Sequence, residues 1–250
     1  MAKKLFKILL LLVSISVGKS YAGWYECYNF KGNVGNYPLT LSIQIRAGYF
    51  GEKAKKNYNI VGIYKYDRYN SPIRLEGKID LSNNNVVLYE IANEKHTAIF
   101  EFKLLEGTGD GFWLNKSTSK KLPLHLEMVS KIVDLNLNSE FSDVDVLQFQ
   151  SLKDFYLVSS YSKVKGIDKA QLAKLKILRK KDNSVYQTID LSNMEYQAGN
   201  LMTIIFDNVS VLNFNKKILG VSRQLGKNQD PLCIFYNVQT RIFNLEKSSK

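Results

Sequence analysis

The chain has 250 residues, of which 45% are hydrophobic, and this is enough to form one large core or two small ones. Its 15 Tyr and 13 Phe, set against only 4 Pro, favour an all-β or β-rich protein. The formal net charge is +12, but the Lys and Arg residues are spread along the chain instead of clustering on one helix. This spread argues against nucleic acid as a partner. An anionic protein or envelope polymer fits better, and the charge also serves solubility.

The first 22 residues have the three parts of a secretory signal peptide. Residues 1–7 are basic, residues 8–17 are apolar, and Ser20 and Ala22 place small residues before a cleavage site ahead of Gly23. The apolar run is shorter than the roughly 20 residues that a membrane-spanning helix needs. We therefore predict an exported, periplasmic protein with no membrane attachment after cleavage. Removing the segment takes away four lysines and leaves a formal charge of +8.

The clearest pattern in the mature chain lies between residues 61 and 90 and predicts an antiparallel meander. In residues 73–81, apolar residues and glycine alternate with charged residues, as in a strand with one buried and one wet face. Residues 67–72 and 82–85 supply turns, because Asn tolerates left-handed backbone. Further strands are predicted at residues 24–28, 39–45, 97–105, 112–113 and 122–128, a loop at 48–59 and a turn at 106–111. About seven strands would form a first module over residues 23–130, a small barrel or curled sheet.

Residues 131–250 have a weaker pattern and predict a second β-rich subdomain. Strand-like runs lie at residues 144–149, 185–189, 201–206, 232–238 and 241–245. Residues 168–179 fit either a helix or a strand, and residues 152–161 show no clear period. Because no linker rich in Pro, Gly or Ser separates the halves, we expect any two subdomains to pack together. The predicted fold is all-β or mainly β, an antiparallel meander or small barrel followed by this subdomain.

Residues that could perform catalysis or hold a metal are few and poorly grouped. The two histidines, His96 and His125, and the two cysteines do not have the spacing of a zinc site. The remaining candidates are carboxylates that could pair, namely Glu76, Glu90, Glu101, Asp143 and Asp145. On the wet face of a sheet such residues usually serve solubility. We therefore predict no enzyme activity, no catalytic or metal site and no cofactor.

Cys27 and Cys233 lie near the two ends of the mature chain. An oxidising compartment favours a disulfide bond between two such cysteines, and we predict a Cys27–Cys233 bridge. Two separate buried thiols are the alternative.

Several short motifs resemble, in their order, a β-rich periplasmic module of Gram-negative bacteria. They are VGIYKY at 61–66, IRLEGKID at 73–80, LYE at 88–90, GFW at 111–113 and LPLHL at 122–126. The second half resembles a domain that often follows this module, through LKILRKKD at 175–182, VYQTI at 185–189 and IFYN at 234–237. Related proteins include lysozyme-inhibitor-like immunity proteins, which protect a bacterium against envelope-attacking toxins.

That second domain normally carries a calcium loop of the form D-x-N-x-D-G-x-x-D-F. The matching run here, VLNFNKKILG at residues 211–220, keeps Asn213 but has lost its carboxylates and gained two lysines. Since Ca²⁺ needs several anionic oxygens, the loop is predicted not to bind it.

The resemblance implies an exported binding protein that neutralises a lysozyme-like or peptidoglycan-targeting toxin. A mature charge of +8 would repel cationic lysozymes, so the expected partner is a secreted toxin or cell-wall hydrolase with a neutral or acidic cleft. The alternatives are a β-barrel that binds a lipid or glycan, and an uncharacterised envelope enzyme. An unfilled, aromatic-lined barrel would favour a ligand, whereas a filled barrel with a protruding loop would favour the inhibitor. Exposed loops at residues 48–59 and 161–166 are candidates for the contact.

Overall fold

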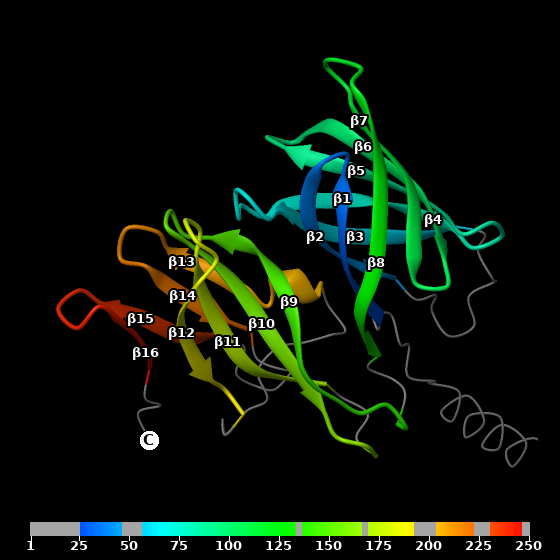
Figure 1. The fold of residues 1–250 in the computed structure, drawn as a ribbon. Helices are drawn as coiled ribbons and strands as arrows, with labels where there is room; N and C mark the ends of the chain where they lie inside the picture. The colour runs from blue at the N-terminus through cyan, green and yellow to red at the C-terminus, as the bar shows by residue number, and fades with distance from the viewer. Residues whose placement is uncertain are drawn as a thin grey trace, which may run out of the picture.

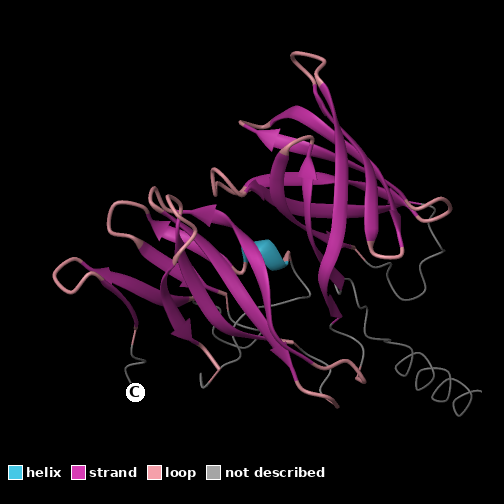
Figure 2. Ribbon diagram, viewed as in Figure 1, coloured by secondary structure: helices cyan, strands magenta, loops and turns pink. Residues whose placement is uncertain are grey.

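The computed structural model describes residues 26–46, 57–133, 137–166, 170–192, 204–222 and 231–246. These residues form a closed eight-stranded antiparallel barrel followed by two four-stranded antiparallel sheets (Figures 1 and 2). The prediction of an all-β fold, with a small barrel and then further β-structure, is confirmed. No helix in the described residues is long and apolar enough to cross a membrane. The signal segment and its cleavage site lie outside the described residues.

The barrel strands follow one another in chain order, and the last pairs with the first to close the ring. They are β1 (Glu26–Val34), β2 (Tyr37–Ile45), β3 (Asn57–Tyr66), β4 (Ile73–Asp80), β5 (Asn85–Ala92), β6 (Lys95–Leu105), β7 (Thr108–Asn115) and β8 (Lys121–Val133). The predicted meander is β3, β4 and β5. Asn70 and Asn84 take left-handed backbone in its two turns, with φ of 52° and 58°, as predicted. The barrel has eight strands where about seven were expected.

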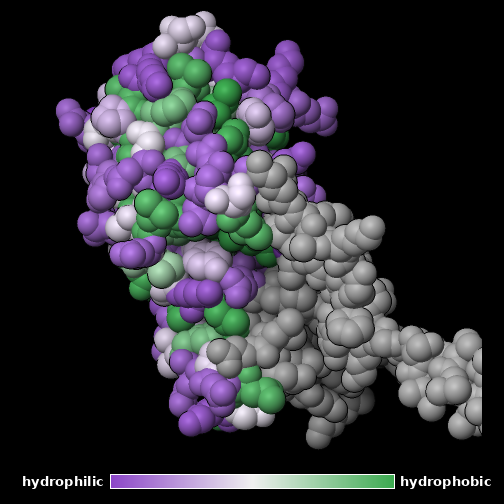
Figure 3. Space-filling view, turned by 90° about the vertical axis from the view of Figure 1, so that its right-hand side faces the viewer, coloured by the Kyte–Doolittle hydropathy of each residue, from purple (hydrophilic) through white to green (hydrophobic). Residues whose placement is uncertain are grey.

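The interior of the barrel is filled with side chains. Alternate residues of seven of the strands point inward and are at most 3% exposed: Phe30, Val34, Leu39, Leu41, Ile43, Ile60, Tyr64, Leu75, Ile79, Val86, Leu88, Phe100, Phe102, Leu124 and Leu126. Trp113 of β7 packs against them. Eight strands enclose a space that such side chains just fill. The outward face is mainly hydrophilic where Figure 3 shows it, with hydrophobic residues in small separate groups. The barrel is therefore a packed core and not a container.

Glycines let neighbouring barrel strands approach closely, as Gly77 and Gly111 show. A Cβ atom on Gly77 would lie 1.9 Å from the carbonyl oxygen of Val87, and one on Gly111 would lie 2.0 Å from that of Glu101. This explains an error in the predicted turn at residues 106–111. Only residues 106–107 form the turn, and β7 begins at Thr108 and runs through Gly111. The glycine-rich run is thus a strand under tight packing.

The two remaining sheets share one hydrophobic core and form a sandwich. Their strands are β9 (Phe141–Ser151), β10 (Phe155–Lys163), β11 (Gln171–Arg179) and β12 (Val185–Asp190), then β13 (Val209–Asn213), β14 (Ile218–Val221), β15 (Leu232–Asn237) and β16 (Ile242–Leu245). Glutamine side chains join the sheet edges. Gln148 on β9 accepts a hydrogen bond from the backbone N–H of Val209 at 3.0 Å. Gln187 on β12 accepts one from the N–H of Phe243 at 2.8 Å and donates one to its carbonyl at 2.6 Å.

Strand β10 is covered on both faces, which is why residues 152–161 lack a period. Residues 155–161 are all buried. Leu157 and Tyr161 pack in the sandwich core, while Tyr156 and Val158 line a crevice of about 250 Å³ shared with barrel residues. A strand buried on both sides has no need for alternation, because neither face meets water.

The barrel and the sandwich pack directly against each other. Outward-facing barrel residues Cys27, Val61, Ile63 and Ile132 belong to the sandwich core. A buried polar link reinforces the joint: the Lys65 ammonium contacts Asp67 at 2.9 Å and Asn70 at 2.7 Å, and the Asn70 amide donates to the carbonyl of Lys180 at 3.0 Å. Burial lowers the pKa of Lys65, and its partner Asp67 opposes that shift.

Three further segments were uncertain or wrong in the sequence-based expectations. Residues 168–179 form a strand, β11, from Gln171 onward. Residues 201–206 were predicted as a strand, but their described part leads into the 3₁₀ helix η1 (Ile205–Asp207). The backbone N–H of Ile205 is bonded to the Gln44 side chain of the barrel at 2.9 Å, so tertiary contacts fix this turn. Strand β3 begins at Asn57, within the expected loop at residues 48–59, and the earlier part of that loop lies outside the described residues.

The predicted disulfide bond is wrong, since no bridge joins Cys27 to Cys233. Cys27 lies on β1, is 1% exposed and faces the sandwich core. Cys233 lies on β15 between Leu232 and Ile234, whose side chains point into that same core. Because side chains alternate along a strand, Cys233 points to the opposite face of its sheet.

We expect a thiol reagent to label Cys27 slowly in the folded protein, because burial blocks access and raises the pKa of its thiol. After unfolding without reductant, mass spectrometry should count two labelled cysteines in every chain. If the label enters only after reduction, the two cysteines form a disulfide bond in solution.

Candidate functional site

The carboxylates that were considered for catalysis are not brought together. Glu76 pairs in register with Tyr89 on the outer face of the barrel, and its carboxylate contacts Arg74 at 2.8 Å. Glu90 instead accepts hydrogen bonds from the Tyr64 hydroxyl at 2.5 Å and the Thr97 hydroxyl at 2.7 Å. Since Tyr64 belongs to the barrel core, Glu90 lies on the other face of the wall from Glu76. Burial, with the Glu90 charge, raises the pKa of Tyr64.

Glu101 lies opposite Val87 and Phe112 in the sheet register, away from both other glutamates. In the sandwich, Asp143 and Asp145 each form a salt bridge with a lysine. Asp143 contacts Lys174 at 2.9 Å, and Asp145 contacts Lys176 at 2.8 Å. Among the described residues, no group of three or more His, Cys, Asp or Glu side chains could hold a metal ion.

The run that resembles a degenerate calcium loop is a tight turn between β13 and β14. The Asn213 side-chain oxygen accepts a hydrogen bond from the backbone N–H of Lys216 at 2.9 Å. The ammonium of Lys217 lies 4.5 Å from the centre of the Tyr236 ring. The retained Asn thus stabilises the turn, and a lysine packs beside it. That the loop does not bind calcium stays a prediction.

His125 lies between two carboxylates on the outer face of β8. Its Nδ1 is 2.6 Å from Asp110, and its Nε2 is 3.4 Å from Glu127. Hydrogen bonding to Asp110, followed by that to Glu127, raises the pKa of His125 above its ordinary value of 6.5.

We expect the NMR titration of the His125 ring to have its midpoint above pH 6.5, and Asp110→Asn to lower that midpoint. The pair favours the folded state below pH 6.5, and this contribution is lost as the pH rises through the folded pKa. An unchanged midpoint in Asp110→Asn would show that the contact does not persist in solution.

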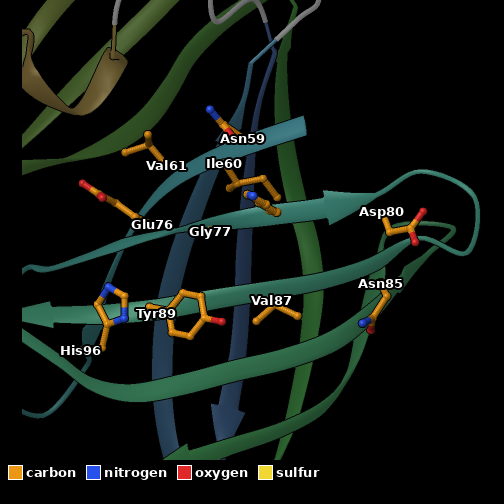
Figure 4. A pocket seen from close by; sticks show the side chains of 11 residues that line it. Asn59, Ile60, Val61, Glu76, Gly77, Asp80, Asn85, Val87, Tyr89 and His96 are labelled. Atoms are coloured by element: carbon orange, nitrogen blue, oxygen red, sulfur yellow. The ribbon is translucent and has the colours of Figure 1, made fainter. Parts of the chain in front are cut away.

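A groove of about 780 Å³ runs across the outer face of strands β3 to β6 (Figure 4). The rings of Tyr89 and His96 are stacked along it, 4.6 Å apart with an interplanar angle of 17°. Glu76 pairs with Tyr89 in the sheet register, and Asn59 and Asn85 line the groove farther along it (Figure 4). An aromatic surface with hydrogen-bonding groups around it is suited to a polar small molecule that has an apolar face.

The β7–β8 hairpin lies at the end of the barrel away from the sandwich (Figure 1). We call its tip, residues 115–121, the lysine hairpin. Residues 116–121 are all exposed and include Lys116, Lys120 and Lys121. No Asp or Glu occurs between residues 111 and 126, so the lysine hairpin contains no acidic side chain.

The lysine hairpin is held in one shape by its own hydrogen bonds. The Asn115 side chain accepts hydrogen bonds from the backbone N–H groups of Ser117 at 3.0 Å and Thr118 at 2.9 Å. The Lys121 ammonium lies 3.6 Å from the centre of the Phe112 ring. A loop ordered in this way loses little conformational entropy on binding.

The two loops named as contact candidates are less informative. Most of residues 48–59 lies outside the described residues. Of residues 161–166, the first three end strand β10, and the exposed part is the turn at 164–166. Sequence reasoning missed both the groove and the lysine hairpin. The acid-free run NKSTSKK at residues 115–121 was the available signal for the hairpin.

Comparisons of this chain with protein-family models, curated proteins and solved structures give no match. The function of each candidate surface must therefore be inferred from its geometry and charge.

Proposed function

We propose that this protein is an exported immunity or inhibitor protein that binds an envelope-degrading enzyme and blocks its cleft. The observation that carries the proposal is a filled barrel with a rigid, cationic hairpin at its free end. A filled interior leaves no space for a ligand inside, so binding must use the outer surface. A preordered, protruding hairpin has the shape to enter a cleft.

The charge of the hairpin indicates the kind of cleft. Enzymes that hydrolyse glycosidic bonds use a pair of carboxylic acids that flank the scissile bond. Three exposed lysines without a neighbouring acid would complement such a cleft. Complementary charges speed association and select the partner, while like charges are repelled. The preferred target is therefore a secreted toxin or cell-wall hydrolase that is neutral or acidic around its active site.

The test is protection in the periplasm together with direct binding. Candidate envelope-degrading enzymes, beginning with the product of any adjacent gene, are each produced in the periplasm with and without this protein, and cell survival is measured. Protection should be accompanied by a complex on gel filtration that weakens as salt rises, with an interface of roughly 1,600 Å². Equal killing in both strains, with no complex on the column, would refute the proposal.

The groove on the outer barrel face supports a second candidate, glycan binding. The Tyr89–His96 stack could carry the apolar face of a sugar ring, with Glu76 and Asn59 bonding its hydroxyls. Titration with soluble peptidoglycan fragments should then shift the NMR signals of His96 but not those of His125. Equal shifts at both rings, or none, would exclude the groove.

A further inference from the structure

A second cationic surface lies at one end of the sandwich, around a pocket of about 490 Å³. Six residues line it: Lys153, Asp154, Phe155, Arg179, Lys180 and Lys181. They come from the β9–β10 turn with the first residue of β10, and from the end of β11 with the turn that follows it. This volume is within the usual range for a small-molecule site, and it is far too small for a folded partner.

Backbone hydrogen bonds fix the two turns against each other. The N–H of Lys180 donates to the carbonyl of Asp154 at 2.9 Å, which joins the two walls of the pocket. The β11–β12 turn is closed by the N–H of Asn183, which donates to the carbonyl of Arg179 at 3.0 Å. The pocket walls are thus set by the sheet and not by long side chains alone.

Arg179 is held in place without a carboxylate partner. Its Nη1 donates to the Ser184 hydroxyl at 3.2 Å, and its guanidinium lies 4.6 Å from the centre of the Tyr186 ring. A guanidinium has five N–H donors in a planar fork. The neutral Ser184 hydroxyl accepts a hydrogen bond from only one of the two terminal nitrogens of Arg179.

The pocket carries an excess of positive charge. Four of its six residues are cations and one is an acid. Within the described part of the chain, no carboxylate lies within 4.0 Å of the Lys153, Arg179 or Lys180 nitrogens, and Lys181 is 3.9 Å from Asp182. Like charges gathered around a concavity repel one another, and an anion would relieve this repulsion.

We propose that this pocket binds a phosphate group, carried by a free sugar phosphate or by a lipid headgroup. A phosphate monoester carries about 1.5 to 2 negative charges and three acceptor oxygens, which suits a pocket lined by four cationic residues. A single carboxylate would leave at least two of the four lining cations without a partner. The fork of Arg179 would bind two phosphate oxygens together, and the lysines would act as point charges. The site is separate from the lysine hairpin, so it stands or falls independently of the inhibitor function.

The experiment is calorimetric titration of the mature protein with inorganic phosphate and with glucose 6-phosphate. We expect saturable binding that weakens as salt rises. Arg179→Gln and Lys153→Gln should each weaken it by about tenfold or more, since hydrogen bonds to charged groups are strong. Arg179→Lys keeps the charge but loses the fork, and it should also weaken binding. Lys103→Gln removes an exposed lysine of the barrel wall and should leave binding unchanged.

Vesicles separate the two sources of phosphate. Cosedimentation with phosphatidic acid vesicles, without binding of glucose 6-phosphate, would assign a lipid headgroup. Saturable binding of the free sugar phosphate would assign a soluble ligand. Vesicles given the same negative charge by oleate are the control. Equal binding to oleate and phosphatidic acid vesicles overturns the proposal, as does the absence of any binding that Arg179→Gln or Lys153→Gln weakens. Thermal melts of each variant confirm that it is folded.

Discussion

Gly77→Ala should destabilise the barrel strongly, lowering the free energy of unfolding by about 1–3 kcal/mol. The added methyl group would lie 1.9 Å from the carbonyl oxygen of Val87, on the neighbouring strand β5. A backbone oxygen cannot rotate away as a side chain can. Strands β4 and β5 would have to separate, and this would strain their ladder and the packing of Leu75 and Leu88. Guanidinium unfolding followed by tryptophan fluorescence measures the change.

Gly220→Ala is the matched control for that experiment. It makes the same substitution in a strand, but the three atoms nearest to the new methyl group all belong to the Leu212 side chain, the closest at 3.0 Å. Leu212 is 49% exposed and can move aside. We expect Gly220→Ala to shift the unfolding midpoint much less than Gly77→Ala. Equal midpoints would mean that the strands at Gly77 are not as close in solution.

The parts of the fold that could be predicted from the sequence are those where one face meets water. Strand β4 was recognised because its apolar residues alternate with charged ones, and the barrel places those two sets on opposite sides of its wall. The turns that flank it were recognised because Asn70 and Asn84 belong to a residue type that accepts positive φ. In both cases a local rule and the final environment agree.

The parts that could not be predicted depend on which strands become neighbours. The glycine-rich sequence around Gly111 predicts a turn, because the close contact between this glycine and Glu101 depends on which strand lies beside it. Strand β10 shows no alternation of apolar and polar residues, because the barrel and the sandwich cover its two faces. The helix η1 replaces an expected strand where the Gln44 side chain bonds the backbone of Ile205. Each of these errors comes from a tertiary contact that local sequence does not contain.

The same limit applies to the candidate site. Cys27 and Cys233 were matched by number and compartment, but strand alternation points them to different faces. Glu76 and Glu90 were placed on neighbouring strands correctly, yet register puts them on opposite sides of the barrel wall. The sequence shows that the lysines of residues 115–121 have no acidic residue near them. Their position at the free end of a barrel could not be predicted from it.

Reversing the charge of the lysine hairpin should abolish complex formation and protection. We expect the triple variant Lys116→Glu, Lys120→Glu and Lys121→Glu to bind the toxin at least about a hundredfold more weakly, because it replaces attraction with repulsion at the cleft. The fold should persist, since the turn is organised by Asn115 and the three lysines are exposed. Calorimetry with purified toxin and survival of toxin-producing cells give the two measurements.

A second triple variant, Arg68→Glu, Lys103→Glu and Lys216→Glu, changes the net charge by the same amount at exposed positions away from the hairpin. It should retain most of the affinity, with a slower association rate, because distant charges steer encounter more than they hold the complex. If both variants lose the same affinity, overall charge and not the hairpin governs binding. If the hairpin variant protects cells fully, another surface makes the contact, and the groove beside Tyr89 and His96 becomes the first place to look.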